Sequence, residues 1–156
     1  MLVTALLFRG SEHGWMAKDF HSRCDNKGPT ISLFKIKDGD CIGGFTKAYQ
    51  WESSYRKFVG DSDSFLFNLS SSRQFTNTGE GGILWYSGYS GWGPAFGDKD
   101  YIELYAEGPF NGDGKCYSCA NRDGYKIVIE GGKNMLTNKE DGYFTISELE
   151  VWEVKY

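Results

Sequence analysis

The sequence predicts a mainly β (α+β) fold, a sandwich of two antiparallel β-sheets with one or two flanking helices. Aromatic residues make up 17% of the 156 residues, and the chain has 21 glycines but only 3 prolines. This composition favours pleated, turn-rich structure over a helical bundle. About eight short apolar or alternating segments separated by turn residues are typical of an antiparallel sandwich. The length suits one domain. Residues 1–156 are therefore expected to form a single domain, excised from a longer protein because it opens on a strand.

The clearest helix is expected near Met16–Lys27. Four of its residues occur at the spacing i, i+3, i+4 and i+7, which places them on one face of a helix: Ala17, Phe20, His21 and Cys24. Gly28 and then Pro29 supply a C-terminal stop. A second, weaker helix is predicted from Trp51 to Phe58.

The first half of the chain contains most of the expected strands. In chain order these are Ala5–Phe8, Thr30–Lys37, Cys41–Thr46, Ser64–Ser70 and Ile83–Tyr86. Asp38-Gly39 separates two of them, and such a dipeptide readily adopts the positive φ of a tight hairpin. In Ser64–Ser70 the residues Phe65, Phe67 and Leu69 fall on one side.

Three further strands are expected in the second half. Tyr101–Glu107 alternates, which predicts Ile102, Leu104 and Ala106 facing inward and Glu103 and Glu107 facing outward. Lys126–Glu130 is rich in β-branched residues. Leu149–Val154 is apolar at most positions, which predicts a strand covered on both faces. Between these strands, the glycine-rich stretches Gly79–Gly82 and Gly91–Gly97 lack the Lys and Ser/Thr of a phosphate loop and are interpreted as turns.

Charge and hydropathy exclude several classes of partner. The net charge is −4 and Lys/Arg runs never exceed two residues, so nucleic acid and anionic membranes are not expected partners. No apolar stretch approaches the ~20 residues that cross a bilayer. The apolar start of the chain has no basic region before it and ends at Arg9-Gly10, unlike a signal peptide. We therefore expect no transmembrane segment and a cytoplasmic location.

The four cysteines leave one alternative open. Cys116 and Cys119 form a CxxC, the spacing of a zinc knuckle or a thiol redox pair. A zinc site would need two more ligands, which His21 and Cys24 could supply. However, these two lie on the helix face expected to pack inward, so reduced core cysteines remain the simpler interpretation and no metal is expected.

Candidate catalytic residues are scarce. His13 and His21 are the only histidines, and the sequence contains no Gly-x-Ser-x-Gly elbow. We therefore expect no catalytic residue, no cofactor and no enzymatic activity.

An aromatic loop is the most informative surface candidate. Trp85, Tyr89 and Trp92 lie among glycines, and exposed Trp and Tyr side chains can stack on sugars or anchor a protein partner. A carbohydrate-binding sandwich is therefore a second alternative. The same rings could instead seal one end of the sandwich.

The order of motifs along the chain resembles the TLDc (TBC/LysM-associated) domain family, in the form common in protists. The motifs that carry the resemblance span essentially the whole chain: Leu7–Gly14, Phe20-His21, Cys24-Asp25, Gly28–Thr30, Gly43–Thr46 leading to Trp51, Phe65–Leu69, Ala95–Gly97, Tyr101–Leu104, Ser118-Cys119, Leu136–Asp141 and Glu148–Trp152. Within the CxxC, Cys119 matches the family and Cys116 is extra.

This resemblance implies a two-sheet sandwich and a function without a catalytic centre. Members of the family are associated with protection against oxidative damage. Several bind the peripheral sector of the proton-pumping vacuolar ATPase and regulate its assembly. The hypothesis is therefore a non-enzymatic protein-interaction domain of the oxidation-resistance type, with vacuolar ATPase peripheral subunits as partner. The residues expected at the partner are Trp92, Gly97, Tyr89 and Trp85.

Overall fold

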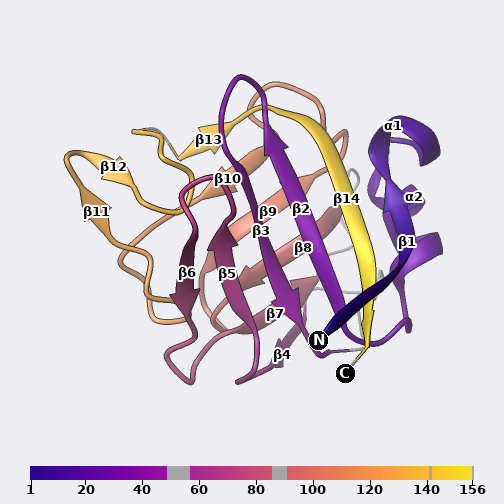
Figure 1. The fold of residues 1–156 in the computed structure, drawn as a ribbon, viewed down its shortest axis with the longest axis horizontal. Coiled ribbons are helices and arrows are strands. Elements are labelled where there is room, and N and C mark those ends of the chain that lie inside the picture. The colour runs from indigo at the N-terminus through magenta and orange to yellow at the C-terminus, as the bar shows by residue number, and fades with distance from the viewer. Residues whose placement is uncertain (49–56, 86–90, 141, 156) are drawn as a thin grey trace.

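Two antiparallel β-sheets stack on one another in the computed structural model, which describes residues 1–48, 57–85, 91–140 and 142–155. One sheet lies in front of the other in Figure 1, and its strands cross those behind. Two helices lie at one edge, beside β1 and β14. The predicted mainly β sandwich with flanking helices is therefore confirmed. The chain ends lie close together because Leu2 pairs with Lys155.

The strand order of each sheet is as follows within the described residues. The first sheet runs β1 (Leu2–Arg9), β14 (Ile146–Lys155), β2 (Thr30–Ile36), β3 (Cys41–Thr46), β5 (Phe65–Asn68), β6 (Arg73–Thr76). The second runs β13 (Tyr143–Phe144), β10 (Cys116–Ser118), β9 (Ile102–Glu107), β8 (Trp92–Gly97), β7 (Gly82–Trp85), β4 (Lys57–Gly60). A separate hairpin pairs β11 (Ile129–Glu130) with β12 (Lys133–Asn134).

The core fills the space between the two sheets. Phe34 and Ile42 of the first sheet and Phe96 and Leu104 of the second are fully buried in one cluster. Gly44 in β3 allows this close packing, because a Cβ placed on it would lie only 2.5 Å from the Phe96 ring. A side chain at this position would push the sheets apart.

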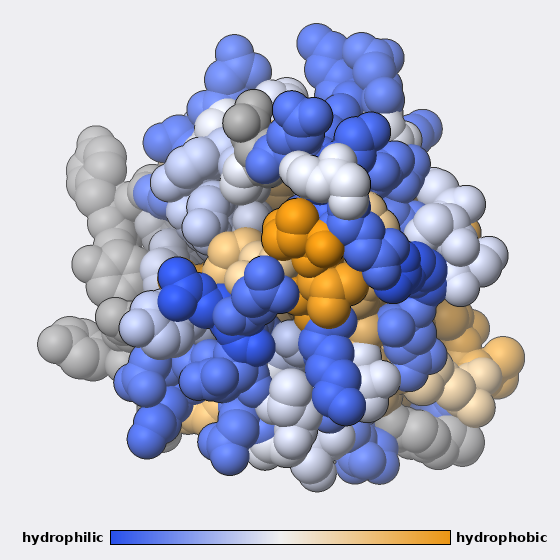
Figure 2. Space-filling model, turned by 90° about the vertical axis from the view of Figure 1, so that its left-hand side faces the viewer, coloured by the Kyte–Doolittle hydropathy of each residue, from blue (hydrophilic) through white to orange (hydrophobic). Residues whose placement is uncertain are grey.

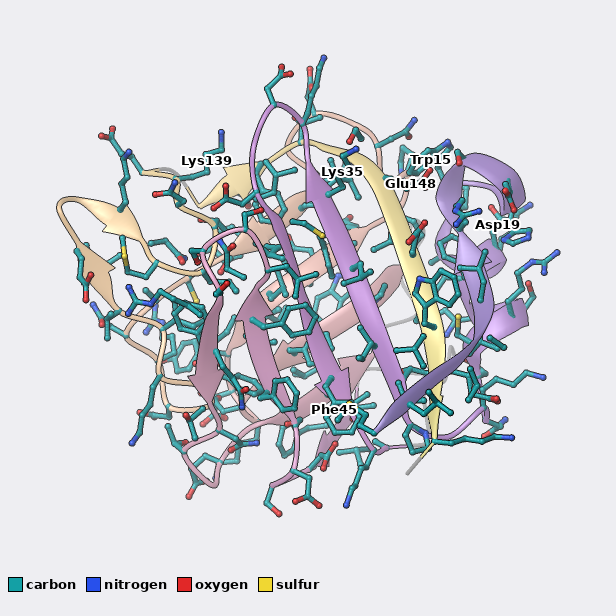
Figure 3. The ribbon with its side chains drawn as sticks, viewed as in Figure 1. Trp15, Asp19, Lys35, Phe45, Lys139 and Glu148 are labelled. Atoms are coloured by element: carbon teal, nitrogen blue, oxygen red, sulfur yellow. The ribbon has the colours of Figure 1, made fainter. Side chains whose placement is uncertain are left out.

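The helical prediction is confirmed in its face and wrong in its length. Helix α2 (Ala17–Cys24) buries all four residues expected to pack inward. It ends at Cys24 instead of Lys27, because Asp25 is extended and Asn26 already has a φ of 60°. Its start is fixed by Asp19, labelled in Figure 3, whose carboxylate accepts a hydrogen bond from the Met16 N–H at 3.1 Å. A short helix that the sequence did not predict, α1 (Gly10–His13), precedes it.

The Asp38-Gly39 hairpin is confirmed, and Asp38 adopts the expected positive φ, 54°.

The predicted helix from Trp51 to Phe58 is wrong at its C-terminal end, where β4 lies, and residues 51–56 fall outside the described residues. Lys126–Glu130 is a strand only at Ile129–Glu130. This hairpin region lies on the side turned to the viewer in Figure 2, where a small hydrophobic area is enclosed by hydrophilic surface. Val128 and Ile129 are among the exposed apolar side chains of the chain.

The interpretation of Gly91–Gly97 as a turn is wrong. Trp92–Gly97 forms β8, between β7 and β9 in the second sheet. Pro94 is tolerated because the pairing with β9 is irregular between Trp92 and Ala95, and the pairs with β7 begin only at Phe96.

The alternation predicted for Tyr101–Glu107 is confirmed at two of the three inward positions, since Ile102 is only half-buried, and it fails at one outward position. Leu104 and Ala106 are fully buried, as expected, but Glu103 is fully buried too. The segment around Gly124 covers it, and the Gly124 N–H donates to a Glu103 carboxylate oxygen at 3.0 Å. The predicted strand Leu149–Val154 is confirmed within β14, but only one of its faces is buried: Leu149 and Val151 are buried, whereas Trp152 is half-buried.

Candidate functional site

Four aromatic side chains form a continuous row on the outer face of the second sheet, and these residues are here called the aromatic row. They come from β8, β9, β10 and β13: Trp92, Tyr105, Tyr117 and Tyr143. The ring centroids of successive members are 5.4, 5.9 and 4.9 Å apart, and the rings are tilted by 40°, 48° and 56°. These separations are those of direct aromatic contact, so the four rings form one surface.

The register of the second sheet aligns the three tyrosines. Tyr117 pairs with Tyr105 on one side and with Tyr143 on the other. Paired residues of neighbouring strands point to the same face of a sheet. The adjacent residues point the opposite way and are buried in the core: Leu104, Ala106, Cys116 and Phe144. Alternation therefore directs all three phenol rings outward.

The aromatic row is accessible and uncharged at neutral pH. Tyr143 is 56% exposed, and the other three members are half-buried. Burial, assisted by the neighbouring Tyr143 and Glu107, raises the pKa of Tyr105 to about 12. Burial also raises the pKa of Tyr117. The hydroxyls of Tyr105 and Tyr117 thus stay protonated at neutral pH. Tyr and Trp combine a large apolar area with a polar group, and both are enriched at the energetic centres of protein interfaces.

A buried histidine fixes the strand that begins the aromatic row. His21 of helix α2 is 6% exposed, and its Nε2 lies 2.9 Å from the Trp92 carbonyl oxygen. Its Nδ1 lies 2.6 Å from a carboxylate oxygen of Asp25. A carbonyl oxygen and a carboxylate both accept hydrogen bonds, so an imidazole protonated on both nitrogens satisfies both contacts. His21 is accordingly part of the scaffold beneath the row.

The residues predicted at the partner have different positions. Trp92 is a half-buried member of the aromatic row, and Gly97 is buried at the end of β8. A Cβ on Gly97 would lie 2.1 Å from the Tyr101 carbonyl oxygen, so the absence of a side chain permits a close backbone approach. Trp85 ends β7, but its side chain and the whole of Tyr89 lie outside the described residues.

Sequence reasoning missed the three tyrosines of the row. Tyr105 lies on the same side of the predicted strand Tyr101–Glu107 as Glu103 and Glu107. This position could have indicated that its ring faces outward. Tyr117 and Tyr143 lie in strands of three and two residues, which are too short to show a period of two.

The structure does not assemble the zinc alternative. Cys116 is fully buried and its thiol donates to the Phe110 carbonyl oxygen at 3.6 Å, whereas Cys119 is half-buried and donates to the Ile102 carbonyl oxygen at 3.2 Å. Burial raises the pKa of Cys116 to about 12 and also raises that of Cys119. Across residues 1–48, 57–85, 91–140 and 142–155, no three His, Cys, Asp or Glu side chains gather closely enough to hold a metal ion.

Charged side chains on the outer face of the first sheet form hydrogen bonds and an ion pair within the chain. Lys35 and Glu148, labelled in Figure 3, are paired neighbours on β2 and β14. The Glu148 carboxylate accepts hydrogen bonds from the N–H and the hydroxyl of Ser11, at 3.1 and 2.5 Å. Arg9 forms an ion pair with Glu150 at 2.8 Å. These contacts fasten α1 and β1 to β14 and give Arg9, Glu148 and Glu150 a structural role.

The fold and the surface define a class: an antiparallel two-sheet sandwich with edge helices and an exposed aromatic row. The sequence profile of the TLDc domain matches residues 2–155, and the chain belongs to the TLDc domain family. The MTOR-associated protein MEAK7 of Gallus gallus is 31% identical in an alignment 156 residues long that covers 96% of this chain. The match spans 31% of that relative, so the chain corresponds to about a third of its length. In the described part of the chain, helices long and apolar enough to cross a bilayer are absent.

Proposed function

We propose that this TLDc domain is a non-enzymatic protein-interaction domain and that the aromatic row contacts its partner. The observation that carries the proposal is the row itself: four touching Trp and Tyr rings on an outer sheet face, one of them 56% exposed. A rigid aromatic surface buries a large apolar area at little cost in side-chain entropy.

The positions of the histidines support a function without catalysis. His21 is held between Asp25 and the Trp92 carbonyl oxygen. The Nδ1 of His13 accepts a hydrogen bond from the Arg9 N–H at 2.9 Å. His21 is thus engaged through both ring nitrogens and His13 through its Nδ1, and these contacts support a structural role for both residues.

The family supplies the partner to test first. Its members are associated with the peripheral sector of the vacuolar ATPase and with protection against oxidative damage, and we propose both for this chain, with a cytoplasmic location. The chicken relative is named for its association with MTOR, which makes an MTOR-containing assembly the second partner to test.

Binding of the purified chain to the purified peripheral sector of the vacuolar ATPase, measured by biolayer interferometry, tests the proposal. Tyr117→Ala removes the central ring of the row and should weaken binding at least tenfold. Tyr143→Ala removes the most exposed ring and should weaken it several-fold. Leu69→Ala provides the matched control, because Leu69 is also 56% exposed but follows β5 in the first sheet.

Two outcomes would change the proposal. Equal affinities for the wild type, Tyr117→Ala and Leu69→Ala would remove the row from the interface. Binding only to an MTOR-containing assembly, with the same order of variants, would keep the surface and replace the partner.

The aromatic row is also the observation that favours the carbohydrate alternative, because sugar rings stack on exposed Trp and Tyr. Titration with soluble polysaccharides while following tryptophan fluorescence checks this alternative. A saturable change that disappears in Trp92→Ala would replace the protein partner with a glycan.

A further inference from the structure

A second surface feature lies at the turn that follows β8. It is a pocket of about 450 Å³, here called the acidic pocket, and these residues line it: Thr78, Glu80, Asp98, Lys99, Asp100, Arg122 and Asp123. Four carboxylates therefore face two cations. Three separate segments contribute to it, so only the folded chain forms this concentration of negative charge.

The two cations do not form ion pairs with these carboxylates, and among the described residues no ion pair involves a charged side chain of the acidic pocket. The Arg122 guanidinium lies over the Tyr101 ring, 4.4 Å from its centroid, so the aromatic face receives part of its interaction. The pocket thus keeps a negative potential that draws cations.

The carboxylate of Asp98 lacks a hydrogen-bond donor on one of its oxygens, which is independent evidence for a ligand. This side chain is only 4% exposed, and one of its oxygens accepts hydrogen bonds from the N–H groups of Asp100 and Tyr101, at 2.7 and 2.8 Å. The other oxygen is buried and has no hydrogen-bond partner among the described residues. A buried carboxylate oxygen without a donor destabilises the protein, because it has lost its water and gained nothing in return.

Glu103 is a second buried carboxylate with one oxygen that lacks a donor. Glu103 is fully buried, and its Oε2 also lacks a hydrogen-bond partner within the described residues. Gly124 packs against both residues: a Cβ on it would lie 2.8 Å from the Glu103 Oε2 and 3.0 Å from the backbone nitrogen of Asp98. Burial raises the pKa of Glu103 to about 7, and the negative charges of Asp98 and Asp123 act in the same direction. A cation in the acidic pocket would relieve this repulsion.

We propose that the acidic pocket binds a lysine or arginine side chain of the partner protein, with the exposed carboxylates of Asp100 and Asp123 as its direct contacts and the buried charge of Asp98 adding to the negative potential. This inference rests on the proposed function, because it assumes a protein partner, but it concerns a different surface from the aromatic row. A metal ion fits less well, since no trio of ligating side chains gathers among the residues that the structure describes. An ammonium or guanidinium group instead requires hydrogen-bond acceptors and negative charge, and both are present.

The test uses the complete 156-residue chain labelled with ¹⁵N and an acetylated, amidated tetralysine peptide as probe. Amide chemical shifts are followed during titration. We expect saturable shifts centred on residues 78–80, 98–101 and 122–124. Asp98→Asn keeps the oxygen that accepts from Asp100 and Tyr101 and removes the charge, so it should weaken binding at least fivefold without unfolding the turn. Asp123→Asn, at an exposed position, should weaken it about threefold.

The control variant is Glu153→Gln. It changes the net charge equally but lies on β14 in the first sheet, where an oxygen of the Glu153 carboxylate accepts from the Thr4 hydroxyl at 3.1 Å. Its affinity for tetralysine should stay within a factor of about 1.5 of wild type. Equal losses in Asp98→Asn and Glu153→Gln, or shifts spread over all acidic surfaces, would overturn the inference.

Two further titrations complete the design. Tetraglutamate should cause no shift at these residues, and calcium chloride that shifts them at lower concentration than tetralysine would replace the basic side chain with a metal ion. Tyr117→Ala should bind tetralysine like the wild type. The two proposals can therefore fail separately: the aromatic row fails through the partner-binding assay, and the acidic pocket fails through the peptide titration.

Discussion

The Nε2 of His21 lies 2.9 Å from the carbonyl oxygen of Trp92, although 71 residues separate them in sequence. Helix α2 is thereby joined to the first residue of β8, which also begins the aromatic row. The ring of Trp92 belongs to the row, and its backbone carbonyl is held by His21. A buried imidazole thus orients a ring that the proposed function places at the partner.

Replacing His21 should therefore destabilise the whole domain. His21→Ala removes both hydrogen bonds of the ring and leaves the Asp25 carboxylate without its partner, which should lower the free energy of unfolding by about 2–4 kcal/mol. Urea denaturation followed by circular dichroism measures this change. Ser22→Ala is the control, because Ser22 is exposed on the same helix and should change stability by less than ~0.5 kcal/mol. Equal values for the two variants would contradict the structural role of His21.

Gly97 should not tolerate a side chain. In Gly97→Ala the new Cβ would meet the Tyr101 carbonyl oxygen at 2.1 Å and the Ile102 Cα at 2.9 Å. Because both are backbone atoms, relief requires movement of β9, and we expect a loss of at least about 2 kcal/mol. Gly60→Ala is the matched variant, since its Cβ would meet only the Phe58 ring at 3.6 Å. Thermal denaturation of both proteins measures their stability. A Gly97→Ala protein as stable as Gly60→Ala would refute the expectation.

Glu103 should make stability depend on pH. Burial raises its pKa from 4.5 to about 7, so between these values the folded protein binds a proton that the unfolded chain releases. The free energy of unfolding should then fall as pH rises through this window, by roughly 2–3 kcal/mol. In Glu103→Gln this dependence should disappear.

Urea denaturation at pH 4.5 and pH 8 compares the wild type with Glu103→Gln. The free energy of unfolding of Glu103→Gln, taken relative to that of the wild type, should be higher at pH 8 than at pH 4.5. Glu80→Gln, at an exposed position, serves as the control, and its free energy of unfolding should depend on pH as that of the wild type does. Parallel pH profiles for the wild type and Glu103→Gln would show that Glu103 does not titrate in this range.

The thiols should react slowly in the folded protein. Burial raises the pKa of all four cysteines above the usual value, and Cys24 and Cys116 are fully buried. Since the thiolate is the reactive form, iodoacetamide at pH 7.5 should label half-buried Cys41 and Cys119 slowly and the other two only in urea. Mass spectrometry reads the labelled sites. Rapid native labelling of Cys116, or a disulfide to Cys119, would revive the thiol alternative.

Local patterns were sufficient for much of the fold. The spacing of Ala17, Phe20, His21 and Cys24 identified the buried face of α2, and Asp38-Gly39 identified the first hairpin. Short strands defeated the same reasoning: β10 and β13 contain three and two residues. Trp92–Gly97 was misread because glycine and proline mark turns unless an irregular pairing accommodates them, as the β8–β9 register does around Pro94.

The sequence by itself determined the fold class, the family resemblance and the absence of a recognisable catalytic motif, because these depend on composition and on the order of short motifs. Only the tertiary structure decided which side chains meet. The aromatic row requires the register of four strands, and the acidic pocket requires three segments to converge on Asp98. Glu103 looked like an outward residue because alternation records only the sheet to which it belongs. The segment around Gly124, 21 residues away, covers it and turns an ordinary surface carboxylate into a buried one.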